Sequence, residues 1–219
     1  MERKLATFAV TNQVTKEVRN LSLVEGLSAD HLAFVSREWT AMLTEVKDRI
    51  LIAFRALPEG ERTEDRWNER LGEFGAQDWD WNWEDKTKNK FTGSSYRALG
   101  IVDETSVEAL MVLNLSWESR LDVANPVTSA YVEYVAVAPW NRRMIVPTPR
   151  FNGLGKVLLN IAVTVSLDEG MEGRCGLHSL PQAEGFYKRI GMHDLGLDAD
   201  ENLKYFEFSP EGAKKFLET

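Results

Sequence analysis

YVEYVAVAPWNRRMIVPTPRFNGLGKVLLNIAVTVSLDEGMEGRCGLHSLPQAEGFYKRIGM, residues 131–192, is the stretch from which the fold can be read. It opens within an apolar run over residues 130–138, rich in valine and containing two tyrosines. Such a run is typical of a strand that is buried on both faces, as in a parallel pairing. Glu133 is the one charge inside this strand, so its carboxylate needs either a partner or a cleft.

A helix and a second strand follow this first strand. Apolar residues recur at helical spacing after Gly153, and Gly170 is suited to a left-handed cap at the end of that helix. The next apolar run, residues 176–180, predicts a strand, and a second helix follows it. A strand, a crossover helix and a strand form a βαβ unit. We therefore expect the strands at 130–138 and 176–180 to be parallel.

The turn that opens the first helix is suited to binding an anion. Gly153 and Gly155 lack a Cβ, so a ligand can approach the backbone closely. The first N–H groups of a helix have no partner inside the helix, and the helix dipole adds positive potential there. Arg150 and Lys156 add full positive charges nearby. A phosphate or pyrophosphate is the expected ligand, although a glycine pair before a helix is also typical of an ordinary turn.

Three motifs in this order resemble the GCN5-related N-acetyltransferase (GNAT) family. They are the strand ending Val135-Ala136-Val137-Ala138-Pro139, the turn Arg150-x-x-Gly153-x-Gly155, and the helix Ala183-x-x-Phe186-Tyr187-x-Arg189-x-Gly191-Met192. The resemblance covers about residues 95–208. It implies an α/β protein with the acyl-CoA N-acyltransferase fold, in which helices flank a mixed, twisted sheet. That sheet would be splayed between the strands at 130–138 and 176–180, with the cofactor in the gap.

The resemblance also implies acetyl-CoA as the co-substrate, with no metal. In this family the glycine turn binds the pyrophosphate, and the end of the preceding strand binds the pantetheine arm through its backbone. Two arginines in the link between strand and turn have two interpretations: they hold the adenosine phosphate, or they only cover the surface. The cofactor-binding residues expected here are Val135, Val137, Arg142, Arg143, Arg150, Asn152, Gly153, Leu154, Gly155 and Lys156.

Acetyl transfer to an amine needs a base for the ammonium proton and an acid for the departing thiolate. The resemblance implies Glu133 as the base and Tyr187 as the acid. From the residues alone, Glu133 sits four positions before Val137, so the two should share a strand face. The alternatives are a structural salt bridge from Glu133 to an arginine such as Arg142, and a core role for Tyr187. His178 is a second candidate base or substrate contact, and otherwise a hydrogen-bonded core histidine.

The first 90 residues match no pattern of the family. Ser28 predicts the N-cap of a long amphipathic helix that ends before Pro58, and Thr63 predicts the cap of a second helix. A first strand is expected somewhere in residues 4–27. The segment 76–90 reads AQDWDWNWEDKTKNK, in which Trp79, Trp81 and Trp83 alternate with polar residues. The three indoles either fill the core or form an aromatic substrate wall that, with the neighbouring acids, attracts a cationic amine.

Composition narrows the class of protein. The 219 residues carry a net charge of −8, so we do not expect unassisted nucleic-acid binding. The single Cys175 excludes an internal disulfide, indicates a reducing compartment, and is expected to be a small core residue. The three histidines show no metal-ligand spacing, and no apolar run is long enough for a membrane span. We therefore expect a cytoplasmic protein without membrane partners.

Together these features predict one N-acetyltransferase domain over residues 1–219, with a helical N-terminal portion at 1–90 and an acetyl-CoA-binding core at 95–208. The acceptor is expected to be a primary amine, either a small cationic molecule or a peptide or protein amine. A homodimer is compatible with the sequence. Two alternatives remain open: a non-catalytic module that keeps the fold and binds CoA, and a toxin that acetylates aminoacyl-tRNA.

Overall fold

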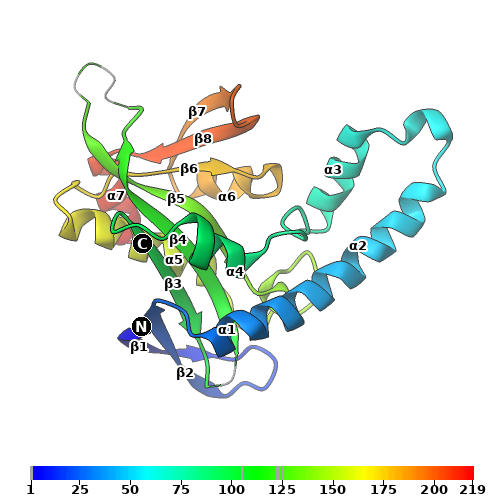
Figure 1. Cartoon of the computed structure of the whole chain (residues 1–219), viewed down its shortest axis with the longest axis horizontal. Helices are drawn as coiled ribbons and strands as arrows, with labels where there is room; N and C mark the ends of the chain where they lie inside the picture. The colour runs from blue at the N-terminus through cyan, green and yellow to red at the C-terminus, as the bar shows by residue number, and fades with distance from the viewer. Residues whose placement is uncertain (1, 105, 122–123, 125) are drawn as a thin grey trace.

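The computed structural model describes residues 2–104, 106–121, 124 and 126–219. Its strands form one eight-stranded sheet in the order β1-β2-β3-β4-β5-β6-β8-β7 (Figure 1). Only β5 and β6 pair in parallel, and every other neighbouring pair is antiparallel. The predicted α/β class with a mixed sheet is confirmed. The strands are β1 (Arg3–Thr11), β2 (Val18–Glu25), β3 (Tyr96–Val102), β4 (Val107–Glu118), β5 (Thr128–Val137), β6 (Cys175–Ser179), β7 (His193–Asp198) and β8 (Leu203–Phe208).

The helices begin largely where the sequence predicted. The Ser28 hydroxyl accepts the backbone N–H of His31, and Thr63 and Ser209 cap two further helices in the same way. A π-helical turn at Val35–Trp39 joins α1 to α2, so the long helix predicted after Ser28 is one continuous helical run. The helices are α1 (Ala29–Phe34), α2 (Thr40–Arg55), α3 (Glu64–Glu73), α4 (Trp83–Asp85), α5 (Leu154–Asp168), α6 (Glu184–Arg189) and α7 (Pro210–Leu217).

Helices cover both faces of the sheet. The apolar side of α5 packs on one face together with α6 and α7, and Cys175 is fully buried in this core. Burial raises the pKa of the Cys175 thiol to about 12, in keeping with the core role predicted for it. On the other face α1, the π-helical turn and Trp83 form a second core, in which the Trp39 and Trp83 rings meet edge to face. The far parts of α2 and α3 project away from the sheet as an arm (Figure 1).

The two central strands separate soon after they meet. Their parallel register covers only Ala130–Val132 against Cys175–Leu177. Past Val132, β5 continues to Val137 with β4 on one side and no strand on the other. The predicted splay between the strands at 130–138 and 176–180 is therefore confirmed. Because the diverging strands leave backbone groups of β5 without a sheet partner, this gap is a place where a ligand can pair with the backbone.

The N-terminal region differs most from expectation. It contributes two strands, β1 and β2, where one was expected, and both join the main sheet next to β3. The segment 76–90 is a series of turns followed by a short helical stretch that begins with α4, so it is not a strand. The sequence also predicts a hairpin turn at 103–106 and a polar loop at 118–128, and residues 105, 122, 123 and 125 of these segments lie outside the described residues. Within the described chain, no helix combines the length and hydropathy that crossing a membrane requires.

Candidate active site

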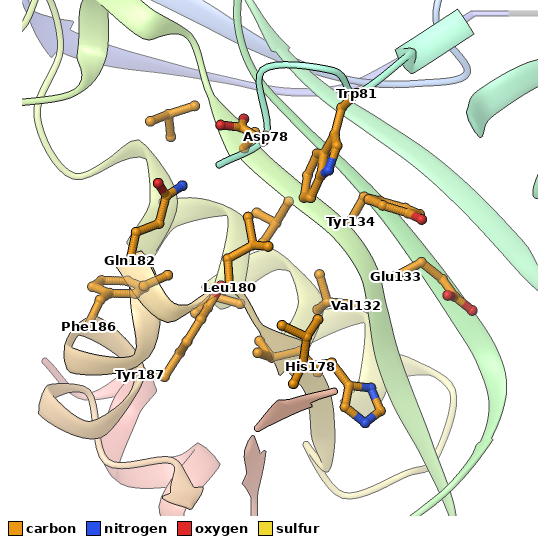
Figure 2. Close-up of a pocket in the computed structure, with 18 of the residues that line it drawn as sticks. Asp78, Trp81, Val132, Glu133, Tyr134, His178, Leu180, Gln182, Phe186 and Tyr187 are labelled. Atoms are coloured by element: carbon orange, nitrogen blue, oxygen red, sulfur yellow. The ribbon is translucent and has the colours of Figure 1, made fainter. Parts of the chain in front are cut away.

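A cavity of about 470 Å³ fills the gap between β5 and β6 (Figure 2). At one end it reaches Gly155 at the start of α5, and at the other it reaches Trp117 and Glu201. Its walls carry both predicted catalytic residues, together with several aromatic rings. The residues that line it include Asp78, Trp81, Tyr131, Glu133, Tyr134, Arg142, Arg143, His178 and Tyr187.

The start of α5 has the geometry expected of an anion site. Gly153 is the N-cap residue and has φ +79°, a left-handed conformation that glycine adopts without a steric penalty. The first helical hydrogen bond runs from the Val157 N–H to the Gly153 carbonyl, so the N–H groups of residues 154–156 have no acceptor in the helix. No acidic residue lies in the first turn. A Cβ on Gly155 would meet nothing closer than 4.0 Å, so this wall of the cavity is open.

The end of β5 presents backbone groups to the cavity. The Ala138 N–H donates to the Glu108 carbonyl at the β4 side. Because successive residues of a strand direct their backbone groups to opposite sides, those of Val135 and Val137 point into the gap. The Val137 carbonyl already accepts Nε–H of Arg142 at 2.9 Å. Val135 and the N–H of Val137 therefore remain as the backbone groups that can bind a ligand here.

Two of the four cations expected near the phosphates have carboxylate partners inside the protein. Arg142 makes a bidentate ion pair with Asp78, at 2.6 and 2.7 Å, and also donates to the Gly75 carbonyl. Arg150 donates to Glu108, a fully buried carboxylate that also accepts from Trp140 and Asn141.

These contacts give both arginines a structural role, which the sequence did not reveal. Arg143 lines the cavity, and no carboxylate of the described chain lies within 4.0 Å of its guanidinium or of the Lys156 ammonium. Asn152 is exposed beside the turn, whereas the Leu154 side chain is buried in the core, so only its backbone faces a ligand.

Glu133 occupies a β-bulge. Val112 pairs with Tyr134 and Leu113 pairs with Val132, so Glu133 is the extra residue on β5. The bulge interrupts the alternation of side chains, because Val132, Val135 and Val137 all pack on the α5 side while Tyr134 and Ala136 pack on the other. The expectation that Glu133 shares a face with Val137 assumed unbroken alternation, and the bulge removes that assumption, so the shared face stays a prediction. A bulge turns a side chain away from the regular pleat, and this one directs Glu133 to the cavity.

The carboxyl of Glu133 is held by an amide and not by a cation. Asn114 Nδ2 donates to it at 2.9 Å, and Arg142 pairs with Asp78 instead, so the alternative salt bridge to Arg142 is wrong. Burial raises the pKa of Glu133, the hydrogen bond from Asn114 opposes this, and the nearby Glu201 raises it further. A carboxyl whose pKa lies above its ordinary value is better matched to accepting a proton from an amine.

Tyr187 lies on α6 with its ring between Phe186 and Phe206. The residue is 6% exposed and lines the cavity, and Figure 2 shows its side chain extending toward Leu180. Its hydroxyl makes no hydrogen bond with the described residues. Burial raises the pKa of Tyr187, so the hydroxyl keeps its proton near neutral pH and is available as a donor. The ring thus serves the core while the hydroxyl remains available to the cavity.

His178 belongs to a partly buried hydrogen-bond chain. Its Nδ1 meets the Tyr131 hydroxyl at 2.6 Å, and its Nε2 meets Asp198 at 3.0 Å. Asp198 is also paired with Arg120. His178 therefore combines the two predicted roles: its imidazole is hydrogen-bonded within the protein and also lines the cavity.

The three tryptophans of segment 76–90 are not on one face. Trp83 is buried in the core beside Trp39, and Trp79 packs near α2 under the ammonium of Lys47. Only Trp81 lines the cavity, where its ring meets Tyr134 edge to face with centroids 4.8 Å apart. The segment is a chain of turns, so the strand alternation that would align the indoles is absent.

Several residues of the site were not identified from the sequence. Asn114 holds Glu133, and Asp78 neutralises Arg142, yet both are separated by many residues from the groups they serve. Tyr131 is buried at the far end of the cavity. Glu201 lies in the turn between β7 and β8 and adds a carboxylate to that end. An apolar strand containing a polar tyrosine was the only available signal for Tyr131, and the other residues had none.

No protein-family model matches the sequence, and no curated protein matches it. Solved structures do match. An uncharacterized protein from Bacillus halodurans has a TM-score of 0.54 at 9% identity, over 99% of this chain and 96% of that one. Two N-acetyltransferases are also similar. PaiA from Thermoplasma acidophilum, in complex with coenzyme A, has 13% identity and a TM-score of 0.45, over 85% of this chain and 97% of that one. A GCN5-related N-acetyltransferase from Ralstonia eutropha has 17% identity and a TM-score of 0.44, over 82% of this chain and 96% of that one.

The similarity to the Bacillus halodurans protein extends over nearly the whole of both chains, so the two share their overall fold. At 9% identity this similarity concerns the fold alone and assigns neither activity nor acceptor. What this chain adds to the fold is the content of its own cavity: the glycine turn, the bulged Glu133 and the hydroxyl of Tyr187.

Proposed function

We propose that this protein is an acetyl-CoA-dependent N-acetyltransferase that acetylates a primary amine. The observation that carries the proposal is the single cavity that joins the start of α5 to Glu133 and Tyr187. The free N–H groups of residues 154–156, with Lys156 and Arg143, are the cofactor's phosphate contacts. The backbone of Val135 and Val137 holds the pantetheine arm in the gap beside β5.

In the proposed reaction the amine attacks the thioester directly. An amine in water is mostly ammonium, so one proton must leave before the nitrogen has a lone pair. Glu133, with its raised pKa, accepts that proton directly or through water. The C–N bond forms, the C–S bond breaks, and the thiolate takes a proton from the Tyr187 hydroxyl. The second proton of the new amide nitrogen is released in the end to solvent, from which Tyr187 is reprotonated. No covalent intermediate on the protein is needed.

The acceptor is a cationic amine in this proposal. The end of the cavity beyond Glu133 carries the rings of Trp81, Trp117 and Tyr134 together with the carboxylate of Glu201. Aromatic faces and carboxylates both attract ammonium groups. Asp78 and Glu84 do not provide this attraction, because Arg142 and Lys88 pair with them.

A screen of acetyl-CoA consumption over small amines, polyamines, aminoglycosides and peptide N-termini tests the activity. The cofactor site is tested separately by calorimetry with Gly155→Glu, which places a carboxylate where a phosphate is expected. A Cβ at this position meets nothing closer than 4.0 Å, so the variant should fold and yet lose acetyl-CoA binding. Gly60→Glu adds the same charge at an open position on the α2–α3 connection and is the matched control. Unchanged affinity in Gly155→Glu would refute the cofactor assignment.

A further inference from the structure

A chain of hydrogen bonds leads away from the cavity at its acceptor end. It begins at the Tyr131 hydroxyl on β5, passes through the His178 imidazole on β6, and reaches Asp198 at the end of β7. Arg120, just after β4, closes it with an ion pair to Asp198 at 2.5 Å. Tyr131 and His178 both line the cavity. Four residues far apart in the sequence therefore form one connected path from the cavity wall to the far edge of the sheet.

The direction of each hydrogen bond follows from the charge of Asp198. Arg120 and the backbone N–H of Asp200, with His178 itself, hold the pKa of Asp198 well below its usual range, so it is a carboxylate that only accepts. The Nε2 of His178 must then carry the proton. In the neutral imidazole Nδ1 is an acceptor, and the Tyr131 hydroxyl donates to it. The proton of Tyr131 is thus directed at His178, while its oxygen keeps lone pairs for a donor in the cavity.

Neighbouring aromatic rings fix the position of the Tyr131 side chain. Its ring stacks on Trp117, with centroids 4.1 Å apart, and lies parallel to Tyr205. Burial raises the pKa of Tyr131, and the charges of Glu133 and Glu201 raise it further. It therefore remains a neutral phenol that relays a proton, because a stable tyrosinate is disfavoured beside two carboxylates. The titratable and charged groups that face the pair are Glu133, Asp198, Glu201, Arg120 and Tyr205.

We propose that Tyr131 is a further catalytic residue, whose oxygen accepts the second proton of the acceptor amine and whose own proton passes to His178. This inference rests on the proposed function. An ammonium must lose one proton before it attacks, and the nitrogen must lose another once the C–N bond has formed. Glu133 accepts the first of these. The Tyr131–His178 path accepts the second.

The proton balance of the step is complete. As the amine nitrogen bonds to the thioester carbon, its N–H proton moves to the Tyr131 oxygen, and the phenol proton moves to Nδ1 of His178. The resulting imidazolium lies between the Tyr131 oxygen and the Asp198 carboxylate. The C–S bond then breaks, and the thiolate takes the Tyr187 proton. His178 and Glu133 later return their protons to solvent, and solvent reprotonates Tyr187. Two protons leave the ammonium, one ends on CoA and one is released. Asp198 and Arg120 are positioning residues.

Nitrogen NMR of the histidine side chains tests the hydrogen-bond directions without any turnover. The chain has only three histidines, so His178→Asn assigns the signals of His178. In the neutral ring of His178 we expect the proton on Nε2, and we expect Asp198→Asn to remove that preference. A proton found on Nδ1 of the neutral ring would mean that Tyr131 accepts from His178, and it would overturn the relay.

Kinetics test the catalytic role, with 1,5-diaminopentane as the first acceptor probe and thereafter any amine that the wild-type protein acetylates. Tyr131→Phe should lower kcat by roughly 10²-fold or more, with an unchanged KM for acetyl-CoA. It should also change the pH dependence of kcat in the same way as His178→Asn. Tyr96→Phe is the matched control, because Tyr96 lies on β3 outside the cavity and its hydroxyl makes no hydrogen bond with the described residues.

The outcomes are distinguishable from failure of the proposed function. If wild type acetylates the amine and Tyr131→Phe turns over equally fast, the relay is refuted and the proposed function stands. If His178→Asn and Tyr131→Phe lose activity together with acetyl-CoA affinity or thermal stability, their role is structural and the relay is again refuted. If wild type consumes no acetyl-CoA with any amine, the proposed function fails and the relay fails with it.

Discussion

Replacing Asp78 by Asn should destabilise the protein strongly, because Asp78 neutralises a buried arginine. The side chains of Asp78 and Arg142 are 3% and 10% exposed, and the pair is bidentate. Arg142 also holds the carbonyls of Gly75 and Val137, so it ties the segment after α3 to the end of β5. Removing one partner of a buried pair leaves the other charge buried without compensation, at a cost of about 3–5 kcal/mol.

That cost converts into a measurable change of melting temperature. For a protein of this size 1 kcal/mol corresponds to about 2–4 °C, so Asp78→Asn should lower Tm by roughly 6–20 °C. Circular dichroism at neutral pH provides the measurement. Glu69→Gln, which removes an exposed ion pair with Arg66 on α3, is the matched control and should leave Tm nearly unchanged.

A second pair of variants separates a structural role of Arg142 from a role in binding phosphate. The double variant Asp78→Leu, Arg142→Met leaves neither charge behind and should recover much of the lost stability. It should also retain most of the affinity for acetyl-CoA if the glycine turn and Lys156 are the principal phosphate contacts. The reasoning would be refuted if Asp78→Asn melted like wild type while the double variant lost cofactor affinity, since Arg142 would then have the cofactor as its main partner.

Three further predictions concern the cavity. Glu133→Gln should lower kcat/KM by about 10²–10⁴-fold. Wild-type activity should fall as the pH drops through the raised pKa of Glu133, because a base works only when it is deprotonated. The variant should lack this limb of the pH–rate profile. Tyr187→Phe should slow turnover without changing acetyl-CoA affinity or Tm, and equal turnover with chemistry rate-limiting would show that Tyr187 is only structural. Glu201→Gln should raise the KM for a cationic amine alone and weaken its dependence on salt, whereas an unchanged KM would place the amine elsewhere.

The central elements were predictable because each had a strong local signal. The apolar run at 130–138, the glycine turn and the periodic helix after it specify a βαβ unit by rules that depend on neighbouring residues only. The helix starts at Ser28, Thr63 and Ser209 were predictable for the same reason, since a capping side chain accepts a backbone N–H three residues away. Non-local pairing was not predictable. Nothing in residues 3–25 indicates that both of its strands join the edge of the main sheet.

Charge pairing separates the predicted cofactor site from the observed one. A run of cations near a glycine turn indicates a phosphate site only if those cations are free. Arg142 and Arg150 are instead engaged by Asp78 and Glu108, which lie 64 and 42 residues earlier in the chain. Sequence spacing carries no information about such partners. The backbone N–H groups of α5, by contrast, are unpaired by the geometry of any helix start, and that part of the prediction depended on no distant residue.

The bulge at Glu133 shows most clearly why the catalytic geometry required a structure. Alternation along an ideal strand placed Glu133 with Val137, and on that face it would point into the apolar core against α5, where an unpaired carboxylate is costly. One extra residue on β5 changes the phase of the strand, so Val132 and Val135 stay in the core while Glu133 is released to the cavity and to Asn114. The same polar residue that looked out of place in an apolar run is thus the reason to expect a bulge. A carboxylate inside a strand buried on both faces therefore indicates either a buried cation beside it or a break in the pleat. In this protein Arg142 is already paired with Asp78, so the bulge accommodates the charge of Glu133.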